Sequence, residues 1–158
     1  MAKIGIIGAG SWGIALSVLL HNNGHEITVW SILEDEINML KTEHEHKDKL
    51  PGVKLPEDMV FTTSLPEAIE GKDILVLAVP SPFTRSTSHN MKPYVADGQI
   101  IVNVAKGIEE HTLMTLSQII EEEVPQANVA VLSGPSHAEE VGRGIPTTIV
   151  VGAKTRET

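Results

Sequence analysis

Cysteine is absent from the 158 residues of the sequence. A chain without cysteine has no disulfide bonds, no thiolate nucleophile and no cysteine-based metal site. This composition suits a reducing compartment, and we expect the protein to be cytoplasmic. A chain of this length forms one domain that buries about two thirds of its unfolded surface without covalent cross-links.

Long apolar runs and basic clusters are missing as well. The longest apolar runs have about six or seven residues, far fewer than the ~20 that a membrane-spanning helix needs. No signal peptide is apparent, because the first residues lead directly into an apolar strand. Acidic residues number 21 against 12 basic ones, which gives a net charge of −9. We therefore expect a soluble protein that does not insert into membranes. We also expect no binding of nucleic acid, because the phosphates of nucleic acids bind clustered Lys and Arg.

The chain begins with a glycine motif. Residues 3–7 predict a strand, and G-x-G-x-x-G follows at Gly8, Gly10 and Gly13, ahead of a helical pattern over residues 14–20. In dinucleotide sites the first glycine makes a tight turn, the second lets the pyrophosphate approach the backbone, and the third lets the helix pack on the strand. The helix N-terminus adds unpaired N–H groups and about half a positive charge. The strand before and the helix after favour a dinucleotide site over a structural turn without a ligand.

Extended and helical patterns alternate along the rest of the chain. Continuous apolar runs at residues 74–79 and 100–104 predict strands covered on both faces, as in a parallel sheet. Further strands are expected at residues 25–30, 59–62, 128–132 and 147–151, with helices at 34–41, 64–69, 83–92, 112–123 and 137–141 and a polar surface loop at 42–57. Seven strands separated by helices predict an α/β fold with a Rossmann-like, doubly wound, mostly parallel sheet.

The end of the second strand bears on the choice of cofactor. NAD sites place an acidic residue there for the ribose 2′-hydroxyl, and NADP sites place an arginine nearby. Ser31 occupies the expected position, and Glu34 and Asp35 come one turn later. No Lys or Arg lies between Gly8 and Leu40 to neutralise a 2′-phosphate. This pattern favours NAD over NADP.

The ends of the fourth and fifth strands carry two more candidates, because ligands of parallel sheets bind at the carboxyl ends of the strands. Phe83 follows a turn stiffened by two prolines, and it either lines the cofactor site or belongs to ordinary packing. Lys106 is followed by Gly107 at the end of the fifth strand. In an acidic protein this position favours an anion contact over a solvated surface lysine.

The sixth strand ends in Ser-Gly-Pro-Ser, where Gly134 allows a close backbone approach and Pro135 fixes the turn. Ser136 is expected to be a helix N-cap, with Glu139 completing a capping box three residues later. A helix N-terminus binds anions readily, but a plain structural cap explains this stretch equally well.

Two other polar clusters have simpler explanations. The Glu-His-Glu-His run at residues 43–46 has i, i+2 spacing in an expected loop and no further ligands, so we expect no metal site. Residues 121–123, three consecutive glutamates, are expected to form a solvated helix end. No nucleophile elbow is present, because the glycine turn lacks G-x-S-x-G.

Four motifs together are more specific than the glycine fingerprint alone. They are Ile-Gly-Ala-Gly-Ser-Trp-Gly at residues 7–13, Ala-Val-Pro-Ser at 78–81, Ala-Lys-Gly-Ile-Glu at 105–109 and Leu-Ser-Gly-Pro-Ser-His-Ala at 132–138. With these motifs in this order, the chain resembles the N-terminal domain of bacterial NAD(P)-dependent glycerol-3-phosphate dehydrogenase. The resemblance implies hydride transfer between NAD(P)H and dihydroxyacetone phosphate to give sn-glycerol 3-phosphate, a phospholipid precursor. It also implies that residues 1–158 are the dinucleotide-binding domain, with a helical domain beyond Thr158.

The resemblance assigns roles to individual residues. It places Ser11, Trp12 and Ala138 on the dinucleotide together with the three motif glycines. It places Lys106 on both cofactor and substrate, and Gly134 and Ser136 on the substrate. The proton-transferring lysine of the family belongs to the helical domain, so no catalytic residue and no metal ligand is expected within this chain.

The sequence departs from the family pattern at two positions. Ile32 stands where a His or Arg often follows the second strand, and Lys49 replaces a tyrosine common before Leu-Pro-Gly. Both changes concern the preference for the 2′-phosphate and not the reaction.

Two alternatives to this function are open. One is another Rossmann reductase, of the β-hydroxyacid or ketopantoate type, against which the Lys106–Gly107 and Ser133–Ser136 motifs stand. The other is a dinucleotide-binding domain without catalysis. The resemblance also leaves room for a homodimer of the full-length protein.

Overall fold

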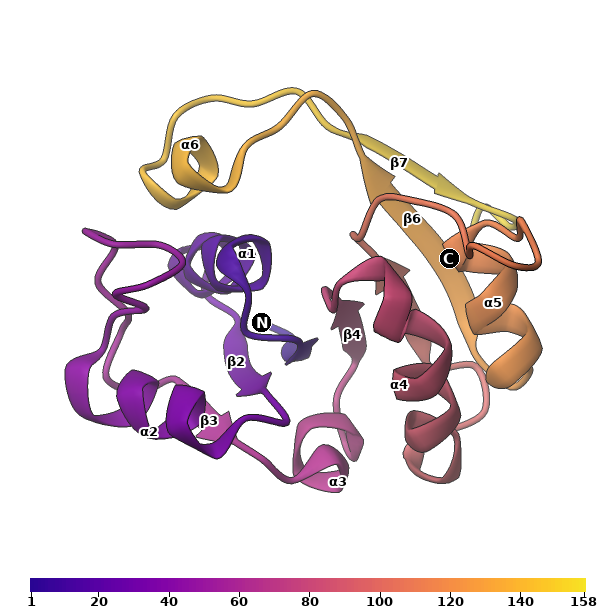
Figure 1. The fold of residues 1–158 in the computed structure, drawn as a ribbon, viewed down its shortest axis with the longest axis horizontal. Helices are drawn as coiled ribbons and strands as arrows, with labels where there is room; N and C mark the ends of the chain where they lie inside the picture. The colour runs from indigo at the N-terminus through magenta and orange to yellow at the C-terminus, as the bar shows by residue number, and fades with distance from the viewer.

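The computed structural model describes residues 1–158, which are built around a seven-stranded sheet (Figure 1). Six strands are parallel in the order β3-β2-β1-β4-β5-β6, and β7 joins the β6 edge in antiparallel orientation. The strands are β1 (Lys3–Ile7), β2 (Glu26–Trp30), β3 (Val60–Thr62), β4 (Ile74–Leu77), β5 (Ile100–Asn103), β6 (Asn128–Ser133) and β7 (Val150–Ala153). The predicted doubly wound, mostly parallel sheet is confirmed.

Helices cover both faces of this sheet. They are α1 (Ser11–Asn22), α2 (Glu34–Glu43), α3 (Leu65–Ile69), α4 (Thr84–Met91), α5 (Leu116–Glu123) and α6 (Ala138–Gly142), with the short 3₁₀ helices η1 (Ser81–Phe83) and η2 (Lys92–Tyr94). Figure 1 shows α1 beside α6, and α4 beside α5 on the other side of the sheet. None of these helices has the length and hydrophobicity that crossing a bilayer requires.

Two layers of apolar side chains result from the alternation of residues along the strands. Ile6 and Val76 pack in the layer beneath α1 and α2, whereas Ile7 and Leu77 pack in the layer beneath α3, α4 and α5. Complete burial of one such side chain stabilises the fold by about 1.5–3 kcal/mol. The apolar runs at residues 74–79 and 100–104 therefore belong to central strands, as their composition predicts.

Strand β1 pairs with β2 on one side and with β4 on the other. The chain leaves β1 through α1 and leaves β4 through α4, and these helices lie on opposite faces of the sheet. At such a switch point the loops diverge and open a crevice outside the carboxyl ends of the strands.

The structure corrects three expected elements. Helix α5 begins at Leu116 and not at residue 112, because Thr115 and Gln118 form a capping box and Leu113 has a φ of 59°. Strand β7 begins at Val150, three residues later than expected. The loop at residues 42–57 is not only a surface loop, because it buries the apolar side chains Leu50, Val53 and Leu55.

Candidate functional site

A cleft of about 850 Å³ opens at the carboxyl ends of the parallel strands. Its walls come from the segments that follow β1, β2, β4, β5 and β6. Most of the residues that the sequence nominates line it: Gly8, Gly10, Ser11, Trp12, Ser31, Phe83, Lys106, Ser136 and Ala138. Residues that are far apart in the sequence therefore share one cleft at the switch point of the sheet.

The glycine turn at the floor of the cleft fits a pyrophosphate. A Cβ on Gly13 would lie 2.1 Å from the carbonyl oxygen of Gly8, so this glycine permits the close contact between helix and turn. A Cβ on Gly10 would have no neighbour within 4 Å, which leaves this backbone open to the cleft. No side chain caps α1, and its first turn holds no acidic residue. The first N–H groups of α1 are therefore available to an anion.

Glu36 supplies a carboxylate at the end of β2, where the sequence offers only Ser31. It lies on the inner face of α2, and its side chain lines the cleft although it is only 8 % exposed. Its Oε2 accepts a hydrogen bond from the Ser31 hydroxyl. Its Oε1 lies 2.8 Å from Nε2 of His46 and 2.5 Å from Nζ of Lys49. We call Ser31, Glu36, His46 and Lys49 the Glu36 cluster.

The Glu36 cluster holds a buried negative charge. Burial opposes ionisation, but hydrogen bonds from His46, Lys49 and Ser31 outweigh it and lower the pKa of Glu36 below 4.5. Sequence reasoning missed Glu36 because it considered only residues close to the end of the strand. The available signal was the helical spacing, since Glu36 precedes the buried Leu40 by one turn and therefore faces inward.

The Glu-His-Glu-His run contributes to this region in another way. His46 is buried and bonded to Glu36, whereas Glu45 pairs with Lys54 at 2.8 Å. His44 ends α2 in a left-handed conformation with a φ of 48°. His46 thus fastens the loop to α2, and the Glu45–Lys54 pair joins two parts of the loop.

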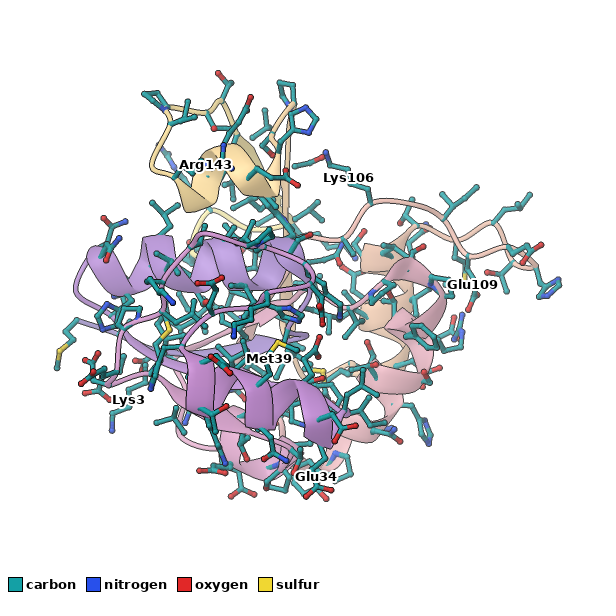
Figure 2. The ribbon with its side chains drawn as sticks, turned by 60° about the vertical axis from the view of Figure 1, so that its left-hand side comes forward. Lys3, Glu34, Met39, Lys106, Glu109 and Arg143 are labelled. Carbon is teal, nitrogen blue, oxygen red and sulfur yellow. The ribbon has the colours of Figure 1, made fainter.

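Lys106 projects from the loop after β5. Its Nζ donates to the carbonyl oxygen of Gly134 at 3.0 Å, which joins the loops after β5 and β6. Figure 2 shows Lys106 on the side of its loop that faces the α6 region. Gly107 has a φ of 133° and lies against Ser81, so the loop after β5 also touches the turn after β4. Phe83, in that turn, is 58 % exposed and lines the cleft, so it is not a core residue.

The expected N-cap at Ser136 is wrong. Helix α6 begins at Ala138 with His137 at the N-cap and no side-chain cap. The backbone N–H of Ser136 donates to the carbonyl oxygen of Gly134, so residues 134–136 form a tight turn that ends before the helix. The Ser136 side chain does not cap α6 and lines the cleft, whereas the carbonyl oxygen of Gly134 accepts from Lys106.

A second ion-pair cluster holds the base of the Lys106 loop. Arg85 on α4 binds Glu109 bidentately at 2.6 and 2.8 Å and also lies 2.8 Å from both Glu122 and Glu123. Hydrogen bonds from Arg85 and Thr112 lower the pKa of Glu109 to about 2. The expected solvated end of α5 is thus partly wrong, since two of its three glutamates bind Arg85. We call Arg85, Glu109, Glu122 and Glu123 the Arg85 cluster.

Comparison with known proteins identifies the family. Residues 3–158 match the family model described as NAD-dependent glycerol-3-phosphate dehydrogenase N-terminus. The chain belongs to this family. A glycerol-3-phosphate dehydrogenase [NAD(P)+] from Agathobacter rectalis is 65 % identical over 100 % of the chain and 47 % of its own length. One from Fusobacterium nucleatum is 58 % identical over 99 % of the chain and 48 % of its own length.

A solved structure agrees with this assignment. The crystal structure of glycerol-3-phosphate dehydrogenase from Coxiella burnetii is similar with a TM-score of 0.92 and 29 % identity, covering 99 % of this chain and 48 % of that chain. The chain thus spans about half the length of the relatives it matches. The family match supports the glycerol-3-phosphate dehydrogenase interpretation over the hydroxyacid or ketopantoate alternative.

Both departures from the family pattern lie at the β2 end of the cleft. Ile32 lines the cleft with a side chain that is 75 % exposed. Lys49 lines it too, but its amine is bound to Glu36. The β2 end of the cleft therefore presents one apolar side chain and one paired cation.

Proposed function

We propose that the chain is the dinucleotide-binding domain of an NAD(P)-dependent glycerol-3-phosphate dehydrogenase. The enzyme would transfer a hydride between NAD(P)H and dihydroxyacetone phosphate to give sn-glycerol 3-phosphate. The observation that carries this proposal is the single cleft in which the open N-terminus of α1, Lys106 and Ser136 meet. The names of the relatives supply the substrate. Because the relatives are about twice as long, a helical domain would follow Thr158.

Each residue that the sequence nominates then has a defined task. Gly8, Gly10 and Gly13 would shape the pyrophosphate site, and Ser11, Trp12 and Ala138 would contact the dinucleotide. Lys106 would bind cofactor and substrate through its positive charge, and Gly134 and Ser136 would hold the substrate. The bound cofactor supplies the hydride, and orientation of the substrate against it lowers the barrier by several kcal/mol.

Protonation of the new alkoxide needs a general acid that we place in the helical domain. General acid catalysis contributes typically 10²- to 10⁴-fold to a rate. We expect residues 1–158 alone to bind NADH and to reduce dihydroxyacetone phosphate at least about 10²-fold more slowly than the complete protein. Steady-state NADH oxidation by the two proteins, at equal cofactor saturation, tests this. Comparable turnover by residues 1–158 and by the complete protein would place the general acid within this chain. A complete protein that does not oxidise NADH in the presence of dihydroxyacetone phosphate would refute the proposed activity.

The Glu36 cluster supports a preference for NAD over NADP. A 2′-phosphate at the end of β2 would approach the Glu36 carboxylate, and the nearest cation, Lys49, is already bound to that carboxylate. Like charges at close range raise the free energy of the complex. We expect NADH to bind about tenfold more tightly than NADPH, a difference of about 1.4 kcal/mol.

Calorimetric titration of both cofactors at equal ionic strength measures this preference. Glu36→Gln removes the negative charge and frees the Lys49 amine. It should strengthen NADPH binding relative to NADH binding by about tenfold in Kd. Glu34→Gln is the matched control, because it makes the same change at an exposed position of α2 and should leave the ratio unchanged. Tighter binding of NADPH by the unmodified chain would contradict the preference and assign the 2′-phosphate to Lys49.

The proposed function also includes the cellular location, the partners and the oligomeric state. We infer a cytoplasmic enzyme of small-molecule metabolism that does not bind nucleic acid, supported by the net charge of −9 and the lack of cysteine. A homodimer of the complete protein would appear as twice the monomer mass in sedimentation equilibrium.

A further inference from the structure

The loop that carries Lys106 has no hydrophobic anchor. From Ala105 to Thr115 no residue is buried, and Ile108 and Leu113 are 57 % and 70 % exposed. Within the loop, an isolated bridge joins Ile108 to Thr115, and the N–H of Glu109 donates to the carbonyl of Met114. These bonds shape the loop but do not fix it to the rest of the domain. Something else must therefore hold Lys106 over the cleft.

Few side-chain hydrogen bonds fasten this loop to the remainder of the chain. At its start, Asn103 bonds the backbone of Ala105. In the middle, Lys106 reaches the Gly134 carbonyl, a bond that the amine must give up or share when it binds an anion. The third attachment is Arg85, which binds Glu109 three residues beyond Lys106 and also lies 3.6 Å from Sδ of Met114. The Asn103 bonds hold the start of the loop, and Arg85 holds the part beyond Lys106 when Lys106 turns to a ligand.

The geometry of Arg85 suits this task. Its guanidinium makes two parallel bonds to Glu109, an arrangement that fixes direction as well as distance. Glu122 and Glu123 on α5 hold the opposite edge of the guanidinium. Figure 2 shows Glu109 beside the helices while Lys106, on the same loop, lies towards α6.

Arg85 also connects the loop to the other wall of the cleft. It lies on α4 two residues after Phe83, and η1 leads directly into that helix. The Arg85–Glu109 pair thus joins the turn after β4 to the loop after β5, in addition to the contact between Gly107 and Ser81. A shift of this ion pair would change the distance between Lys106 and everything else that lines the cleft.

We propose that Arg85, acting through Glu109, is a positioning residue that places Lys106 for the phosphate group of the substrate. This inference rests on the proposed function, because it takes a phosphate monoester as the ligand of Lys106. Arg85 touches neither substrate nor cofactor in this assignment. Its effect is on where the lysine amine lies and not on the chemistry of the amine.

Steady-state kinetics of the complete protein test the proposal with four variants. Arg85→Gln and Glu109→Gln each break the bidentate pair from one side and should raise the KM for dihydroxyacetone phosphate about tenfold. The KM for NADH should rise by no more than about threefold although Lys106 also contacts the cofactor, because the glycine turn still holds the pyrophosphate. The kcat should stay within about threefold, because the reacting groups are untouched. The double variant should be no worse than either single one. Arg85→Lys keeps the positive charge but cannot make two parallel hydrogen bonds to Glu109. Its KM for dihydroxyacetone phosphate should therefore lie between those of the unmodified protein and Arg85→Gln.

Two controls separate positioning from stability. Lys154→Gln removes a 2.7 Å ion pair to Glu121 on helix α5, and Lys54→Gln removes a 2.8 Å ion pair to Glu45 that lies outside the Arg85 cluster. Both should leave the KM for dihydroxyacetone phosphate within about twofold. Amide hydrogen exchange should become faster over residues 105–115 in Arg85→Gln and not in Lys154→Gln.

The outcomes are distinct. Inactivity of the unmodified complete protein on dihydroxyacetone phosphate refutes the proposed function, and the phosphate assignment for Lys106 is lost with it. An active protein in which Arg85→Gln leaves this KM unchanged refutes the positioning role alone. A rise in the KM values of both substrates together with a lower melting temperature also refutes it, since that pattern indicates general destabilisation.

Discussion

Two charged clusters flank the cleft, and they are built in opposite ways. In the Glu36 cluster one carboxylate is surrounded by donors, and the side chains of Glu36 and His46 are only 8 % and 2 % exposed. In the Arg85 cluster one cation is surrounded by three carboxylates, and Arg85 and Glu109 are 29 % and 22 % exposed. The first cluster lies at the end of β2 and the second at the base of the loop after β5.

Because the Glu36 cluster is more deeply buried than the Arg85 cluster, we expect the charges of the two clusters to have different roles. A buried charge is weakly screened, so we expect Glu36 to act on an anion that enters the β2 end of the cleft. A partly exposed ion pair contributes little net stability, but a bidentate pair still fixes geometry. We therefore expect the Glu36 cluster to govern which cofactor binds and the Arg85 cluster to govern where a loop lies.

The largest expected effect is on stability at the Glu36 cluster. Glu36→Ala leaves the donors of Ser31 and His46 buried without their acceptor and should lower the free energy of unfolding by about 2–3 kcal/mol. Denaturant unfolding followed by circular dichroism measures this. Glu34→Ala, at an exposed position of the same helix, should change it by less than about 0.5 kcal/mol. Equal effects of the two substitutions would contradict the importance of burial.

A smaller effect is expected from pH at the Arg85 cluster. The pKa of Glu109 is lowered from 4.5 to about 2, so the ionised form adds stability that is complete above pH 4.5 and is lost as the pH falls towards 2. The difference in denaturation midpoint between the unmodified chain and Glu109→Gln should be constant from pH 7 to 5. It should then shrink between about pH 4.5 and 2. A difference that grows on acidification would have the wrong sign for this ion pair.

The smallest effect is expected from salt. Raising the ionic strength from 0.1 to 1 M shortens the screening length from about 10 to 3 Å, which weakens exposed pairs more than buried ones. Hydrogen exchange over residues 105–115 should therefore accelerate slightly, by about twofold, while exchange in α2 stays unchanged. Equal acceleration of both segments would mean that the two clusters are screened alike.

Much of the fold could be predicted because it depends on local patterns. The apolar runs of β4 and β5 and the glycine turn before α1 each specify their element within a few residues, and they lie where the sequence indicates. Helix α5 was less predictable, because the residues before Leu116 have a helical pattern but fold into a loop whose base is tied to Arg85. Strand β7 is antiparallel at the sheet edge, an orientation that its own residues do not encode.

The sequence by itself determined the parallel sheet, the site of the glycine turn and the motifs that nominate Lys106, Ser136 and Ala138. These features follow from spacing within short segments, and spacing is a property of the chain. Only the tertiary structure decided that Glu36 meets Ser31 at the β2 end of the cleft and that Arg85 reaches Glu109, 24 residues away. The physical reason is that a carboxylate or guanidinium finds its partners by direction and burial, which arise only when separate elements pack together.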